Sequence, residues 1–139
     1  MSPSGRSQKK LKRQIFIVED EPIIAALLCD VIMDFGYEYV GPAYDLQGAL
    51  SMVRKLDRQI DAALVDIMLG EKLAYELCHP LHARHVPFAF ATGLKRDMIE
   101  APWRKCRHVA KPFSRKDIAA VLALLLEQDQ TLQPDLVAV

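Results

Sequence analysis

The 139-residue chain lacks three features that would each indicate a particular class of protein. It has no excess of basic residues, because 18 Lys and Arg are matched by 18 Asp and Glu, so nucleic acid is an improbable partner. Its longest apolar run, Ile118–Leu126, has nine residues, whereas a membrane-spanning helix needs about 20. Its three cysteines, Cys29, Cys78 and Cys106, have neither metal-binding spacing nor the number that a disulfide framework needs. We therefore expect a cytoplasmic protein with reduced thiols and no membrane insertion.

The charges are distributed unevenly along the chain. The first 13 positions hold five basic residues and no acidic ones, so the remainder has 13 basic and 18 acidic residues, a net charge of −5 (13 − 18). Most other residues of 1–13 are Ser, Gly, Pro and Gln, which is typical of a disordered arm. We expect one globular domain over 14–127, because 51% of the chain is hydrophobic, and a C-terminal tail over 128–139.

Short apolar segments alternate with helical patterns through this central region. The short segments are β-branched, aromatic or almost continuously apolar, as strands buried on both faces of a parallel sheet are. Such an alternation predicts an α/β fold in which a doubly wound sheet has helices on both faces. The five expected strands are 15–18, 39–40, 63–65, 88–91 and 108–110.

Capping residues mark where three of the helices should begin or end. Pro22 suits a first helical turn and Gly36 a position just past a helix end, so they frame the first helix. Asp45 can cap the second helix. Ser114 and Asp117 have the spacing of a capping box before the last helix.

Two prolines are expected to disturb the other helices. Pro80 lies within 73–85, where it should kink or shorten the third helix. Pro102 should cut short a fourth helix near 95–101. The predicted fold is therefore a doubly wound five-stranded parallel sheet with helices on both faces and a short fourth helix.

Polar residues follow directly after four of the expected strands. Glu19 and Asp20 follow the first strand and Asp66 the third, while Thr92 and Lys111 end the fourth and fifth. In doubly wound sheets ligands bind at this carboxyl edge. Carboxylates are ligands for Mg²⁺, and an aspartate can also act as a nucleophile that forms an acyl phosphate. A lysine and a threonine hydroxyl would donate to phosphoryl oxygens, so the sequence predicts magnesium-dependent phosphoryl transfer onto Asp66.

Four segments that contain these residues, "IFIVEDEP", "ALVDIML", "FATG" and "VAKPF", carry a resemblance to a known family. In their order and spacing they resemble the receiver domains of bacterial two-component response regulators, which implies a flavodoxin-like five-stranded sheet of strand order 2-1-3-4-5. The resemblance implies that Asp66 accepts a phosphoryl group from a phosphohistidine of a sensor histidine kinase or a histidine phosphotransferase. It also implies that Glu19 and Asp20 bind Mg²⁺ with Asp66, and that the backbone carbonyl of Met68 is a further metal ligand.

The same resemblance implies roles for other positions. Thr92 matches the switch hydroxyl, and His108 stands at the second switch position, which is usually aromatic. Lys111-Pro112 matches a lysine followed by a proline whose peptide bond is usually cis. Gly70 stands where most receivers have a proline. The segment "PFAFATG" is similar to a subgroup of single-domain receivers with a Phe-Ala-Thr-Gly motif, which implies signalling by protein–protein contact or phosphate shuttling rather than enzymatic turnover.

Two other functions stay open at this point. A metal-dependent phosphatase with an aspartyl-phosphate intermediate usually carries a second acid two residues after the nucleophile, and Met68 occupies that position. A nucleic-acid-binding module could use the basic arm, and would then show steep salt-dependent retention on DNA.

The last helix offers a candidate partner face. The predicted buried stripe of this helix consists of Ile118, Val121, Leu122 and Leu125. Its opposite side presents Ala119, Ala120, Ala123 and Leu124, where a surface helix is normally polar. We expect this side to bind a downstream protein of unknown identity or a second copy of the domain, the alternative being a quiet surface that exposes little apolar area.

Overall fold

Five parallel strands form the central sheet of the computed structural model, which describes residues 12–55 and 59–127. The C-terminal tail and all of the basic arm except its last two residues therefore lie outside the described residues. The sheet has the order β2-β1-β3-β6-β7, which confirms the predicted order 2-1-3-4-5. Its strands are β1 (Gln14–Val18), β2 (Glu38–Ala43), β3 (Ala62–Val65), β6 (Phe88–Thr92) and β7 (Arg107–Ala110).

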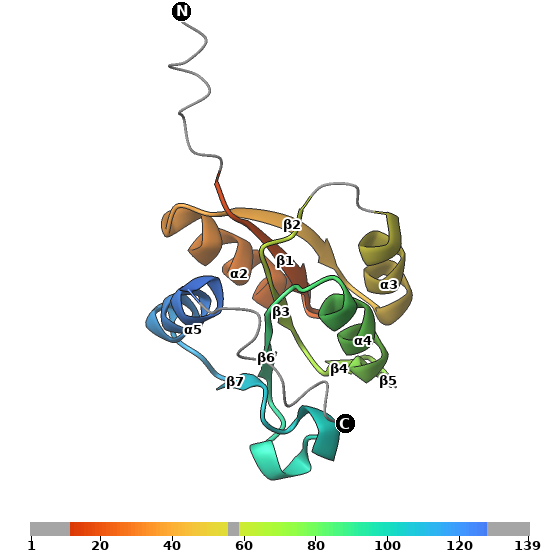
Figure 1. Cartoon of the computed structure of the whole chain (residues 1–139). Coiled ribbons are helices and arrows are strands. Elements are labelled where there is room, and N and C mark those ends of the chain that lie inside the picture. The colour runs from red at the N-terminus through yellow and green to blue at the C-terminus, as the bar shows by residue number, and fades with distance from the viewer. Residues whose placement is uncertain (1–11, 56–58, 128–139) are drawn as a thin grey trace, which may run out of the picture.

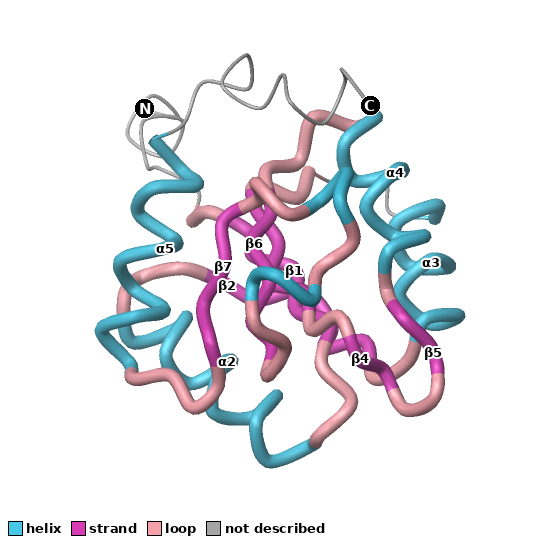
Figure 2. Tube along the Cα trace, turned by 90° about the horizontal axis from the view of Figure 1, so that it is seen from below, coloured by secondary structure: helices cyan, strands magenta, loops and turns pink. Residues whose placement is uncertain are grey.

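Two layers of helices enclose the sheet (Figures 1 and 2). Helices α2 (Pro22–Asp34) and α5 (Arg115–Glu127) cover one face, where their apolar side chains pack with Ile15, Ile17 and Leu64. Helices α3 (Leu46–Lys55) and α4 (Tyr75–Ala83) cover the other face, where Phe16, Phe88 and Phe90 lie in their core. Because both faces are covered, every residue of β3 and β6 is buried, which explains their uninterrupted apolar sequences.

Two predicted caps and one predicted helix start are present. Asp45 Oδ1 accepts a hydrogen bond from the Gly48 amide at 2.6 Å, just before α3. The capping box forms at α5, since the Ser114 amide donates to Asp117 Oδ2 (2.8 Å) and the Asp117 amide donates to Ser114 Oγ (3.1 Å). Helix α2 begins at Pro22, as predicted.

The region expected to hold the fourth helix contains two 3₁₀ turns instead of an α-helix. They are η1 (Arg96–Met98) and η2 (Ala101–Trp103), and Pro102 lies inside the second one. The prediction of a shortened helix is therefore confirmed. The buried Trp103 ring fixes this segment by packing against Phe88, at 6.3 Å between ring centroids.

The structure departs from the predicted elements at two places. Strand β2 extends beyond residues 39–40, because Gly41 and Pro42 continue an edge strand where a proline is tolerated. Gly41 has φ +92°, and a Cβ there would lie 2.8 Å from the Ala43 amide nitrogen. A small antiparallel hairpin, β4 (Met68–Leu69) with β5 (Lys72–Leu73), was not predicted, because two-residue strands carry no readable periodicity.

Helix α4, with nine residues, continues through Pro80 to Ala83, so the proline does not divide the third helix. Over the described ranges 12–55 and 59–127, no helix combines the length and the apolar character that crossing a membrane requires.

Candidate functional site

The polar residues singled out in the sequence lie at the carboxyl ends of four neighbouring strands. Glu19 and Asp20 come directly after β1, and Asp66 comes directly after β3. Thr92 is the last residue of β6, and Lys111 follows β7. The Lys111 amide donates to the Thr92 carbonyl at 2.9 Å, which aligns these two strand ends. Each buried strand therefore ends where its sequence changes from apolar to polar.

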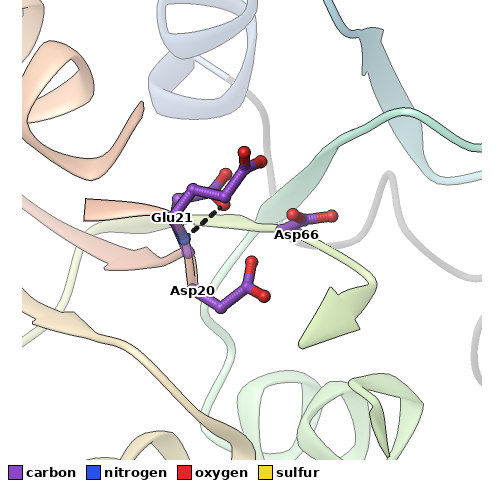
Figure 3. A group of neighbouring side chains, drawn as sticks. Asp20, Glu21 and Asp66 are labelled. Carbon is purple, nitrogen blue, oxygen red and sulfur yellow. Dashed lines mark hydrogen bonds between the residues drawn. The ribbon is translucent and has the colours of Figure 1, made fainter. Parts of the chain in front are cut away.

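Four carboxylates lie around a common space at this edge (Figure 3). One oxygen from each of Glu19, Asp20, Glu21 and Asp66 lies within 4.8 Å of the others. The Glu19 side chain is fully buried and that of Asp66 almost so, whereas Glu21 is exposed. Like charges this close repel strongly where water is partly excluded, so the cluster needs a positive partner.

Lys111 supplies a positive charge to this cluster. Its Nζ atom donates to Asp66 Oδ2 at 2.9 Å and to Glu21 Oε1 at 3.0 Å. It also donates to Glu19 Oε2 at 3.2 Å and lies 3.0 Å from Glu19 Oε1. The lysine thus connects carboxylates that belong to two different strand ends.

The charges at this edge change one another's pKa values. Burial raises the pKa of Glu19 from 4.5 to about 7, and hydrogen bonds from Lys111 and from the Glu21 amide only partly oppose this rise. Burial alone lowers the pKa of Lys111, but its hydrogen bonds to Asp66, Glu19 and Glu21 outweigh burial and raise that pKa overall. Lys111 therefore stays an ammonium at neutral pH.

Backbone amides fix the orientation of the carboxylates. The Gly70 amide, in the β4–β5 hairpin, donates to Asp20 Oδ2 at 3.0 Å. The Met68 amide donates to Asp66 Oδ1 at 3.2 Å, and the Glu21 amide donates to Glu19 Oε2 at 3.1 Å. The hydrogen bond from Gly70 requires an N–H, which a proline at this position would lack.

The two residues at the switch positions both contact Leu94. Thr92 is fully buried, and its Oγ1 accepts a hydrogen bond from the Leu94 amide at 3.4 Å. His108 Nε2 lies 2.9 Å from the Leu94 carbonyl oxygen, a contact that places a proton on Nε2. Thr92 and His108 are therefore linked through a single residue of the loop after β6.

The donor atoms at this edge fit a hard divalent cation. All four side chains of the cluster offer carboxylate oxygens, which Mg²⁺ prefers. Among the described residues, buried Glu19 Oε1 accepts no hydrogen bond, although Lys111 Nζ is near it. A bound cation would supply this buried oxygen with the partner that it lacks.

The candidate partner face on α5 is narrower than predicted. The predicted stripe of Ile118, Val121, Leu122 and Leu125 is buried, as expected. On the opposite side Ala120 and Leu124 are exposed, but Ala119 and Ala123 are half-buried. Ala120 and Leu124 also line a groove of about 550 Å³ between α5 and β7. The exposed apolar surface of the helix is thus centred on Ala120 and Leu124.

The sequence predicted no role for Glu21, and it identified Gly70 only as a position where most receivers have a proline. Glu21 meets Lys111 across 90 positions of the chain, and Gly70 meets Asp20 across 50. The sequence signal for Glu21 was the run of three acidic residues at positions 19–21. This run indicates where the acidic site lies but not which of the three residues contacts Lys111.

Comparison with known proteins finds similar chains. No family model matches. The solution structure of SdrG from Sphingomonas melonis Fr1 is 38% identical with a TM-score of 0.73, and the match covers 85% of this chain and 99% of SdrG. The BeF3-activated conformation of SdrG, from Pseudomonas melonis Fr1, is likewise 38% identical, with a TM-score of 0.70 over 81% of this chain and 95% of that one.

Two more distant proteins are also similar. The response regulator TrrA from Thermotoga maritima, solved in complex with Mg²⁺ and BeF, is 21% identical with a TM-score of 0.70, over 82% of this chain and 99% of TrrA. The transcriptional regulatory protein PdtaR of Mycobacterium tuberculosis is 23% identical over 130 residues. That match covers 91% of this chain but spans only 62% of the length of PdtaR.

Proposed function

The chain belongs to the receiver domains of response regulators, and on that premise we propose that Asp66 accepts a phosphoryl group from a phosphohistidine. The donor is a sensor histidine kinase or a histidine phosphotransferase. The observation that carries the proposal is the 2.9 Å ion pair between Lys111 Nζ and Asp66 Oδ2, next to three further carboxylates. This ion pair supports the proposal, because an ammonium beside the carboxylate of Asp66 can bind the oxygens of an incoming phosphoryl group.

The proposed transfer needs a nucleophile, charge stabilisation and orientation. An oxygen of Asp66 forms the new bond to phosphorus while the bond from phosphorus to the donor nitrogen breaks, and the bonding electron pair leaves with the donor imidazole. Lys111 and the Thr92 hydroxyl donate to the phosphoryl oxygens. Glu19, Asp20, Asp66 and the Met68 carbonyl would hold Mg²⁺, which when bound neutralises phosphoryl charge.

The proposed output of phosphorylation is a change in protein contacts. A phosphoryl group that draws Thr92 and Lys111 toward it would disturb the Leu94 contacts shared by Thr92 and His108. We propose that the chain acts in the cytoplasm as a signalling protein that passes phosphate on or binds a downstream protein. The face at Ala120, Ala123 and Leu124 is the proposed contact surface for that protein or for a second copy.

Incubation with acetyl phosphate and Mg²⁺, followed by intact mass measurement, tests the phosphoacceptor role. We expect one phosphoryl group on the wild-type chain and none on Asp66→Asn, because the amide is not a nucleophile but has nearly the same shape. Glu38→Gln, at the amino end of β2, is the matched control and should be labelled like wild type. Labelling of the Asp66→Asn chain would contradict the assignment.

A further inference from the structure

Lys111 has a carboxylate partner, Glu21, to which the phosphoacceptor reaction assigns no role. Glu21 Oε1 lies 3.0 Å from Lys111 Nζ, as close as the two other carboxylate partners, Glu19 and Asp66. A lysine ammonium has three N–H donors. Its three hydrogen bonds, to Glu19, Glu21 and Asp66, use all of them. A phosphoryl oxygen can therefore bind Lys111 only if one carboxylate gives up its contact.

The three partners differ in how easily they can be released. The side chain of Glu19 is 0% exposed and that of Asp66 is 5% exposed, whereas that of Glu21 is 62% exposed. A buried carboxylate that loses its ammonium partner is left without solvation, which is costly. An exposed carboxylate regains water when it is released, so Glu21 is the partner that Lys111 can exchange.

Resting on the phosphoacceptor role of Asp66, we propose that Glu21 is a positioning residue that holds one N–H of Lys111 until a phosphoryl oxygen takes it. With acetyl phosphate as donor, an Asp66 oxygen bonds to phosphorus as the bond from phosphorus to the acetate oxygen breaks. Acetate leaves with the bonding electron pair, and no proton is transferred. During this step the Lys111–Glu21 contact is replaced by a contact between Lys111 and the phosphoryl group.

This exchange affects one chemical state of the domain only. The Glu21 contact stabilises the unphosphorylated chain and is absent once the phosphoryl group is bound. Its removal should therefore raise the rate of phosphorylation and leave the decay of phospho-Asp66 unchanged. We expect a rise of about two- to fivefold, which corresponds to the loss of one exposed ion pair.

Two substitutions separate the contact from the charge. Glu21→Gln keeps the length of the side chain and removes its charge. Glu21→Asp keeps the charge but is one methylene shorter, so we expect its carboxylate to lose the 3.0 Å contact with Lys111. Glu21 makes no side-chain capping hydrogen bond at the start of α2, so neither change removes a cap. Glu38→Gln is the control for a lost surface charge at the opposite edge of the sheet.

The experiment measures the initial rate of labelling by acetyl phosphate over a series of Mg²⁺ concentrations, and then the decay of phospho-Asp66 after the donor is removed. We expect both Glu21 variants to be labelled about two to five times faster than wild type. We expect their decay rates, and the Mg²⁺ concentration that half-saturates Glu21→Asp, to stay within a factor of about two of wild type.

Unchanged or slower labelling of both variants would overturn the inference, and so would a decay rate that changes as much as the labelling rate. Faster labelling of Glu21→Gln alone would overturn it by showing an effect of charge at a distance. A clearly higher half-saturating Mg²⁺ concentration in Glu21→Asp would overturn it by making Glu21 a metal ligand. If wild type itself takes no phosphoryl group on Asp66, the phosphoacceptor role fails instead, so the two failures are distinguishable.

Discussion

Of the clustered carboxylates, Glu19 has the largest free-energy cost of being charged in the folded protein. Its side chain is fully buried, its pKa is raised to about 7 by burial, and its Oε1 atom accepts no hydrogen bond from the described residues. A carboxylate in that position is stabilised by any cation that reaches it. The proposed magnesium site can therefore be tested through stability as well as through phosphorylation.

We expect Mg²⁺ to raise the melting temperature of the wild-type chain and to leave that of a Glu19→Gln/Asp20→Asn double variant unchanged. The double variant has lost two of the four clustered carboxylates. A ligand at about 100 times its Kd stabilises the folded state by about 2.7 kcal/mol, so the shift is measurable by thermal melting. Glu38→Gln should respond like wild type. An equal Mg²⁺ shift in the double variant would place the ion elsewhere.

The buried thiols provide a test of pH dependence that is independent of the acidic site. Burial raises the pKa of Cys106 from 9.0 to about 12, and nearby Arg96 only partly opposes this rise. Between these values the folded chain keeps a proton that the unfolded chain releases. The stabilisation is thus complete below pH 9 and is lost as the pH rises toward 12.

We expect the free energy of unfolding to fall between pH 9 and pH 10, by on the order of 1 kcal/mol from Cys106. Urea melts at several pH values measure it, and Cys106→Ala is the variant that should flatten this part of the profile. Iodoacetamide should also react slowly with Cys106 in the native state, because only the thiolate is nucleophilic. Parallel profiles for wild type and Cys106→Ala would show that this thiol does not contribute.

At the scale of elements, α5 presents the surface on which the proposed output depends. Ala120 and Leu124 are exposed beside the groove that α5 forms with β7, and Leu124 is 47% exposed. The preceding segment contributes short 3₁₀ turns rather than a full helix. An apolar surface of this kind can be tested by placing charges on it.

We expect Ala120→Glu combined with Leu124→Arg to leave labelling of Asp66 unchanged while abolishing self-association or partner capture, because a charged surface resists burial. Light scattering with and without acetyl phosphate, together with pull-downs, measures these contacts. Gln47→Glu combined with Ala83→Arg, on α3 and α4 at the other face of the sheet, is a charge-matched control. If the wild-type chain stays monomeric with and without acetyl phosphate, and the variant retains the same partners, this side of α5 is not a contact surface.

The elements differ in how far the sequence predicted them, and the reason is local. Strands β1, β3 and β6 are buried on both faces, so their apolar runs are visible without a structure. The extent of β2 was underestimated, because Gly41 and Pro42 read as a break while an edge strand accepts them. The capping box at α5 was predictable because both of its residues lie within one turn.

The residues of the candidate site also differ in how far the sequence predicted their positions and contacts. The position of Asp66 at the end of a buried strand, and of Lys111 at the end of another, follows from the strand pattern and the fold. The contacts of Glu21 and Gly70 could not be predicted, since they depend on how two loops meet after the sheet has formed. The sequence pattern does not specify which residue in such a loop contacts a residue of the other loop.

At the scale of the whole molecule, the contact between Glu19 and Lys111 joins residues 92 positions apart. Glu19 follows the first strand of the sheet, and Lys111 follows the last strand in chain order. Pairing of such distant segments is late and slow in folding, because a long loop must close first. Because synthesis runs from the amino end, a nascent chain contains Glu19 and Asp66 before it contains the ammonium of Lys111. On the proposed function, phosphorylation of Asp66 would therefore require a chain whose last strand has already joined the sheet.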